Sequence, residues 1–229
     1  MDDNAASRIV LGKHINQAGA KKTVEKAHID LTHFSSLTDE ELKNIENEAN
    51  KIIKKSVPIH KSFMLRDEAE KKYGFAIYQG GVPIGEKLRI VDIQGIDVEA
   101  CGGTHLDNTK EAERIKILKS SKISDSIVRI EFVAGKKALE EENKEKNLLN
   151  ELSTLLNCNV NQIPSRVEEL FNLWKDVVKK GKKIQKFELK SVAVYSGDVL
   201  IKVSEILRTQ PEHIVNTINR FIKEIKEKL

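Results

Sequence analysis

The chain has 229 residues, of which 39% are hydrophobic and 32% are charged, and its formal net charge is +4 at neutral pH. This length and apolar content suffice for one or two packed domains. No run of about 18 apolar residues occurs, which excludes a membrane-spanning helix. The acidic, polar start is not that of a secretory signal peptide. Two cysteines in unlike contexts, Cys101 and Cys158, do not make a disulfide framework, so we expect a cytoplasmic protein.

Lysine dominates the positive charge of the chain. A lysine-rich surface suits an acidic partner such as RNA. The alternative is a solvated surface of the kind common in proteins from hot environments. Composition alone leaves both interpretations open.

The first part of the chain alternates between helical and strand patterns. Residues 4–14 are predicted to be the end of a helix, and residues 14–20 and 27–33 to be two strands. Thr38 and Glu41 have the spacing of a capping box, which predicts that a helix begins there. Its apolar stripe recurs at helical spacing and comprises Leu42, Ile45, Ala49, Ile52 and Ile53.

Further strands and a short helix follow before residue 136. The strands are recognised by alternation of polar and apolar residues, and the loops by turn-forming residues. In chain order we expect a strand from Val57, a charged helix at 66–73, a loop at 79–85, strands at 87–93, 115–119 and 127–133, and a connection at 120–125. Interleaved helices and strands predict an α+β domain over residues 1–136.

From residue 137 the pattern becomes helical throughout, which predicts an α-helical region over residues 137–229. A leucine stripe at 148–156 is broken at 157–159, and a new helix begins at Ile163. Trp174 lies on the apolar side of that helix, and we interpret it as a core residue. Residues 179–190 are lysine-rich and form either a linker or an exposed helix.

The helical region contains a repeated pattern at an offset of about 51 residues. The matching apolar positions include Ile163 with Ile214 and Val167 with Ile218. A helix, a break and a second helix with the same spacing predict a duplicated helical hairpin. The alternative is chance similarity between two amphipathic hairpins.

The segment with the clearest chemical pattern is Cys101-Gly102-Gly103-Thr104-His105. A Cys and a His four residues apart can place two zinc ligands on one tight turn or helix start. The glycines let the backbone bend and expose its N–H groups, and a zinc-bound water beside such donors suits hydrolysis. One Cys and one His supply half of a zinc shell, so a plain glycine turn remains the alternative.

Four segments in order resemble the editing domain of alanyl-tRNA synthetase and its freestanding deacylase relatives. They are Leu11–Ala20, His28–Phe34, Asp97–His105 and Ser126–Gly135. The resemblance covers roughly residues 1–185 and is archaeal-like. It implies an editing domain of the threonyl/alanyl-tRNA synthetase second-additional-domain type, followed by the start of the synthetase's C-terminal helical region.

The resemblance also implies an activity and a site. A synthetase pocket for alanine rejects serine or glycine poorly, because small side chains differ little in binding free energy. An editing site then hydrolyses Ser-tRNA(Ala) or Gly-tRNA(Ala). Zinc would be held by Cys101, by His105 and by two ligands of an HxxxH motif that this sequence lacks. By alignment, the second His of that motif would fall at about Met1.

Other site residues are implied in the same way. The backbone N–H groups of Gly102, Gly103 and Thr104 would support the ester oxygen or the tRNA end. Gln17 would orient water or the serine hydroxyl, or is simply an exposed strand residue. Glu99 would support the metal ligands, or is a strand-end carboxylate. Ala20 stands where the family has serine, which is a departure in the substrate-recognition segment.

Three interpretations fit a chain with half a zinc site. The sequence is truncated, the protein has lost zinc, or a second polypeptide carries the HxxxH motif. We expect the third: an editing and C-terminal portion of alanyl-tRNA synthetase that binds tRNA(Ala), works with a separate catalytic chain and forms oligomer contacts through its C-terminal helices. The alternatives are a freestanding trans-editing alanyl-tRNA deacylase and a non-catalytic tRNA-binding or assembly subunit.

Overall fold

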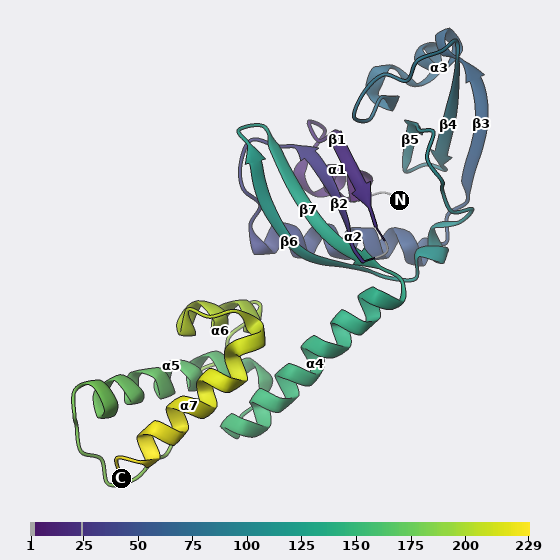
Figure 1. Ribbon diagram of the computed structural model, residues 1–229. Coiled ribbons are helices and arrows are strands. Elements are labelled where there is room, and N and C mark those ends of the chain that lie inside the picture. The colour runs from purple at the N-terminus through teal and green to yellow at the C-terminus, as the bar shows by residue number, and fades with distance from the viewer. Residues whose placement is uncertain (1–2, 24) are drawn as a thin grey trace. The chain divides into compact units, whose positions relative to one another are not determined.

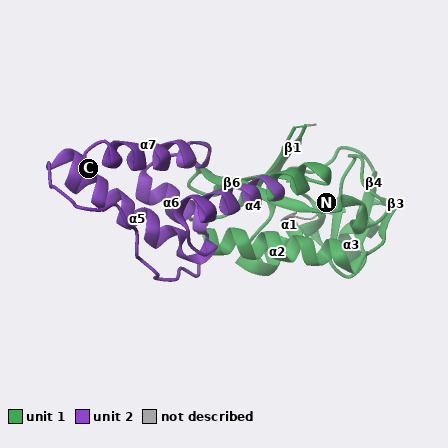
Figure 2. Ribbon diagram, turned by 90° about the horizontal axis from the view of Figure 1, so that it is seen from below, with its two compact units in different colours: residues 1–142 green, residues 143–229 purple. Residues whose placement is uncertain are grey.

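A computed structural model describes residues 3–23 and 25–229 of the chain. The chain divides into two compact units, residues 1–142 and 143–229 (Figure 2). The first unit is α+β and the second is built from helices, which confirms the predicted fold class. The domain boundary expected after residue 136 is the start of α4 (Lys136–Leu156), and the first turns of this helix belong to the first unit.

An antiparallel sheet of four strands forms the larger part of the first unit (Figure 1). Its order is β1 (Gln17–Lys22), β2 (Ala27–Thr32), β7 (Ile127–Ala134) and β6 (Ile115–Ser124). Two helices, α1 (Asp3–Leu11) and α2 (Asp39–Lys55), pack on each other and share one apolar core with the sheet. That core includes Ala6, Ile15, Leu31, Ile45, Ile52 and Ile130.

The start of α2 confirms the predicted capping box. The N–H of Glu41 donates to the hydroxyl of Thr38, and the N–H of Thr38 donates to the carboxylate of Glu41 at 2.8 Å. Two of the N–H groups that a helix start leaves unpaired are satisfied in this way. The helix therefore begins where its sequence predicts.

The connection predicted at residues 120–125 is wrong in extent, because β6 continues to Ser124. Its second half is exposed and polar, so it lacks the apolar alternation that marks a strand in a sequence. Backbone pairing with β7 holds this half in place, with Ser121 opposite Arg129 and Lys122 opposite Val128. Side-chain burial, the property that apolar periodicity in a sequence reports, does not stabilise this half of the strand.

A second, three-stranded antiparallel sheet has the order β3 (Ile59–Leu65), β4 (Lys87–Ile93), β5 (Asp97–Ala100). Helix α3 (Arg66–Tyr73) and the 3₁₀ turn η1 (Phe75–Ile77) cover one face, where Leu88 and Ile90 are buried. On the other face Val91 and Ile93 are buried beneath the segment that follows β5. The 3₁₀ turn η2 (Thr109–Ala112) ends that segment.

The second unit contains two helical hairpins. The rest of α4 and α5 form the first, and α6 and α7 form the second. The elements after α4 are η3 (Val160–Gln162), α5 (Ile163–Trp174), the π-helical turn η4 (Lys175–Lys179), α6 (Val199–Leu207), η5 (Pro211–His213) and α7 (Ile214–Lys226). Residues 180–198 are not helical, so the lysine-rich segment is a linker. Trp174 is half-buried and stacks on Phe221, with ring centroids 4.4 Å apart.

The two hairpins match element by element. In each, a helix ends at a residue with a left-handed backbone, a 3₁₀ turn follows, and a second helix begins. The left-handed residues are Asn157, with φ of 49°, and Arg208, with φ of 53°. Fully buried residues also correspond, as Val167 does with Ile218. The similarity therefore extends to the turns as well as the apolar stripes, and an origin by duplication stays a prediction.

None of the helices in the described part of the chain is long and apolar enough to cross a membrane.

The first turns of α4 should stabilise the first unit. Ala138 is fully buried, and Arg114 donates to the Glu142 carboxylate at 2.6 Å. A chain ended after Lys136 should therefore be less stable to urea than one ended after Lys146, by about 1–3 kcal/mol. Equal unfolding midpoints for the two truncated chains would show that these turns contribute nothing.

Candidate functional site

The segment from Cys101 to Asn108 crosses one face of the three-stranded sheet. At its start, the N–H of Cys101 donates to the carbonyl of Arg89 at 3.0 Å, which extends the pairing of β4 with β5. At its end, the carbonyl of Asp107 accepts from the N–H of Ile59 on β3 at 2.9 Å. Leu106 packs on the buried residues of this face. The segment is a loop, so the turn interpretation of the pentapeptide holds and the helix-start interpretation does not.

Arg89, on the strand that the loop crosses, holds the loop through two of its carbonyl groups. Its Nη1 donates to the carbonyl of Cys101 at 2.7 Å and to the carbonyl of Gly103 at 2.8 Å. Hydrogen bonds from a charged donor are about twice as strong as neutral ones. Sequence reasoning missed this residue. The available signal was its position on β4, two residues before Val91 and therefore on the face that also carries Cys101.

The loop brings Cys101 and His105 to a common point. A Cβ placed on Gly103 would lie 3.6 Å from the Sγ of Cys101 and 3.9 Å from the Nε2 of His105. Both potential donor atoms therefore lie within 4 Å of the position that a side chain at Gly103 would take. A thiolate and an imidazole nitrogen are typical zinc ligands. The donor chemistry of this pair fits the ion, and Gly103 places no side chain between the two residues.

The environment of His105 favours its neutral form. Burial is the largest cause and, together with the positive charges of Lys22, Arg89 and Lys61, it lowers the pKa of His105 to about 4. The imidazole is therefore neutral at pH 7, which is the form that binds a metal ion.

His105 also lines a cleft of about 410 Å³. The loop forms one wall through Thr104, His105 and Leu106. Most of the remaining lining comes from the ends of β1, β2 and β7 and the turn between β1 and β2, with Ile59 of β3 and Lys137 of α4. Apolar side chains in the lining include Phe132, and its cations include Lys22. A partly apolar hollow with a few polar groups is the usual form of a small-ligand site.

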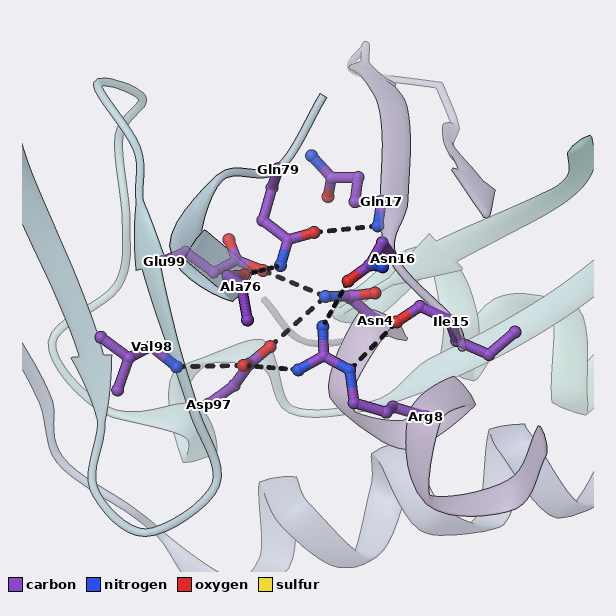
Figure 3. Close-up of polar contacts among 10 residues, drawn as sticks. All are labelled: Asn4, Arg8, Ile15, Asn16, Gln17, Ala76, Gln79, Asp97, Val98 and Glu99. Atoms are coloured by element: carbon purple, nitrogen blue, oxygen red, sulfur yellow. Dashed lines mark hydrogen bonds and ion pairs between the residues drawn. The ribbon is translucent and has the colours of Figure 1, made fainter. Parts of the chain in front are cut away.

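A polar cluster joins α1 to β5, the strand that leads into Cys101 (Figure 3). Arg8 forms an ion pair with Asp97 at 3.1 Å and donates to the carbonyl of Ile15 at 3.1 Å. Asn4 donates to Asp97 at 3.4 Å and to Glu99 at 3.5 Å. These contacts tie β5 to the first helix and to the chain just before β1.

Gln17 lies at the edge of this cluster. Its backbone N–H donates to the side-chain oxygen of Gln79 at 2.8 Å, and its own amide makes no contact with the other residues drawn in Figure 3. The loop that contains Gln79 and Gly80 lies directly against β1. A Cβ on Gly80, whose φ is +72°, would lie 3.2 Å from the carbonyl oxygen of Ala18. The structure thus bonds Gln17 to the segment that contains Gln79, while Cys101, Gly103 and His105 lie in the loop that follows β5. Its predicted role remains a prediction.

The other histidines are arranged differently. His14 and His33 share a contact of 2.9 Å between Nε2 and Nδ1. Burial lowers the pKa of His33, and the nearby His14 adds to the effect. Within residues 3–23 and 25–229, no group of three or more His, Cys, Asp or Glu side chains is placed to hold a metal ion.

Comparison with known proteins shows what the chain is similar to. Residues 88–131, which include β5, the loop and all of β4 except its first residue, match the threonyl and alanyl tRNA synthetase second additional domain. The chain is 39% identical over 226 residues to an alanine–tRNA ligase of Methanopyrus kandleri, a match that covers 96% of this chain and 25% of the relative.

Other alanine–tRNA ligases are similar to the chain to the same degree. That of Methanocella arvoryzae is 46% identical over 182 residues, covering 80% of this chain and 21% of the relative. That of Ignicoccus hospitalis is 43% identical over 215 residues, covering 89% of this chain and 24% of the relative. The chain is therefore homologous to a segment of these archaeal enzymes, and it spans about a quarter of their length.

The buried ion pair near the site gives a prediction about pKa. Burial raises the pKa of Asp97 above its ordinary value of 3.8, although Arg8 acts in the opposite direction. Arg8→Gln should therefore raise this pKa further and destabilise the fold by about 1–3 kcal/mol. Carbon NMR of the Asp97 carboxyl group measures the pKa. Arg129→Gln, which removes the partner of Asp30, is the control and should leave the Asp97 titration unchanged.

The same shift predicts how stability depends on pH. The pKa of Asp97 is higher in the folded state than in the unfolded state. Its contribution to stability is therefore fully present at pH values below the unfolded pKa. This contribution is lost as the pH rises through the folded pKa. The stability of the wild type relative to Asp97→Asn should therefore fall between about pH 4 and neutrality. A rise over that range would contradict the direction of the shift.

Proposed function

We propose that this chain supplies an editing site of alanyl-tRNA synthetase, which hydrolyses the ester of Ser-tRNA(Ala) or Gly-tRNA(Ala). The observation that carries the proposal is that Cys101 Sγ and His105 Nε2 both lie within 4 Å of the side-chain position of Gly103, with His105 lining a cleft. This pair lies in a loop within the matched synthetase domain. Similarity to alanine–tRNA ligases supports the choice of tRNA(Ala).

The residues present fit zinc but do not complete its shell. Cys101 and His105 would hold the ion, and structural or catalytic sites need three or four protein ligands. We propose that an HxxxH pair, on a polypeptide segment additional to these 229 residues, supplies the rest. Bound zinc would supply Lewis acidity toward a water or an ester carbonyl.

The chain's own groups would do the remaining work. Gly102, Gly103 and Thr104 are exposed, so their backbone N–H groups can donate to an ester oxygen. Arg89 holds the carbonyls of this loop and so fixes the direction of those donors. Gln17 would orient the attacking water or the serine hydroxyl. The cleft beside His105 would receive the aminoacyl end and limit its access to water.

The proposed partners are tRNA(Ala) and the polypeptide that carries the aminoacylation domain. The matched relatives are alanine–tRNA ligases about four times as long as the matched segment, which is why a catalytic part additional to this sequence is proposed. The helical second unit is proposed to contribute to association or tRNA contact.

Cys101→Ala tests the site. In the protein assembled with the HxxxH-bearing polypeptide, this change should remove zinc and lower hydrolysis of Ser-tRNA(Ala) by about 100-fold or more, since even the loss of a ligand's hydrogen-bonding partner costs about 10- to 100-fold. The matched control is Cys158→Ala, which removes the other cysteine, in the second unit. Metal analysis and release of serine are the measurements.

Two outcomes would contradict the proposal. Unchanged zinc content in Cys101→Ala would show that Cys101 is not a ligand. Tight stoichiometric zinc and full hydrolysis by the isolated 229-residue chain would show that no further polypeptide completes the site. Zinc binding without hydrolysis of either mischarged tRNA would favour a non-catalytic tRNA-binding subunit.

A further inference from the structure

One row of side chains crosses the three-stranded sheet beside the proposed site. Phe63 of β3 is paired with Arg89 of β4, and Arg89 is in turn bonded to Cys101 at the end of β5. Residues directly opposite each other on antiparallel strands point to the same face. Phe63 therefore lies on the face that carries Cys101, two strand spacings or about 10 Å away.

Phe63 is an unusual residue at this position. Its side chain is 75% exposed, and Leu65, the next residue of β3 on this face, is 46% exposed. A single exposed apolar residue needs no explanation. Here an exposed aromatic ring shares its row with a proposed zinc ligand, and the loop ends at the start of the same strand, where Asp107 bonds to Ile59.

The neighbours of Phe63 on this face include basic residues. Arg89 is its cross-strand neighbour, and Lys87 is opposite Leu65. Arg89 is bonded to carbonyl groups, which leave its charge uncompensated. Among the ion pairs of residues 3–23 and 25–229, none involves Arg89 or Lys87. Lys61, on the same face, is paired with the exposed Asp107.

We propose that Phe63 is a stacking platform for a base near the 3′ end of a single-stranded RNA, with Arg89 and Lys87 beside its phosphates. The proposal rests on the proposed function, because it names the surface that would guide the tRNA end to Cys101 and His105. Proteins that bind single strands combine aromatic platforms with cationic grooves, and every base offers a face for stacking.

The charges favour RNA over a protein partner. A protein-docking patch has an apolar centre from which charged residues are depleted. Here the residue opposite Phe63 is Arg89, and the residue opposite Leu65 is Lys87. The apolar surface is also small, since its neighbours on this face of β3 and β4 are Lys61, Leu65, Arg89 and Lys87.

The test compares two RNA duplexes, one with a short single-stranded 3′ end and one blunt. Phe63→Ala should weaken binding of the first by about 5- to 100-fold, the range for loss of one stacked base. Binding of the blunt duplex should stay within about twofold. Phe63→Trp should retain the affinity, and 2-aminopurine in the overhang should be quenched by the wild type and not by Phe63→Ala.

Phe75→Ala is the matched control, because Phe75 is 74% exposed but lies in η1, which covers the opposite face of the sheet. It should bind both duplexes as the wild type does. Thermal unfolding of each variant checks the fold, which an exposed phenylalanine should not alter.

Several results would overturn the platform. One is that the wild type does not bind the overhang duplex. Others are that Phe63→Ala binds it unchanged, that Phe63→Ala loses affinity equally for both duplexes, or that Phe63→Ala weakens only association with the aminoacylation polypeptide. Hydrolysis of Ser-tRNA(Ala) is measured in parallel, in the protein assembled with the HxxxH-bearing polypeptide. Phe63-dependent binding without hydrolysis would contradict the proposed function alone, and hydrolysis without Phe63 dependence would contradict the platform alone.

Discussion

The double hydrogen bond from Arg89 to the carbonyls of Cys101 and Gly103 is the contact on which the site depends. A loop with two adjacent glycines has many backbone conformations and loses more entropy on ordering than an ordinary loop. A charged donor that holds two of its carbonyls offsets this cost. The same bonds hold the loop in which the Sγ of Cys101 and the Nε2 of His105 both lie within 4 Å of the side-chain position of Gly103.

The strands beneath the loop explain why Arg89 can do this. Arg89 alternates with buried Leu88 and Ile90 on β4, so its side chain emerges on the face that the loop crosses. The short strand β5 is anchored at its start by Asp97, whose burial is partly offset by the ion pair to Arg8. Polar contacts at a sheet edge thus position a loop whose own sequence has little preference for one shape.

The sequence predicted much of this arrangement, for reasons that are local. The capping box at Thr38, the charged helix α3 and the alternating strand β4 each carry their signal within a few residues. The division of the strands into two sheets, and the short strand β5, depend on pairing between distant segments, which periodicity does not report. The CGGTH spacing predicted that Cys101 and His105 lie together. The roles of Arg89 and Phe63 became visible only from cross-strand register.

Zinc X-ray absorption of the protein together with an HxxxH-bearing polypeptide tests the paired role of Cys101 and His105 most directly. We predict a shell with one sulfur at about 2.3 Å and nitrogen ligands at about 2.0–2.1 Å, with the sulfur lost in Cys101→Ala and kept in Cys158→Ala. A shell of nitrogen and oxygen alone in the wild type, or a sulfur that persists in Cys101→Ala, would contradict it.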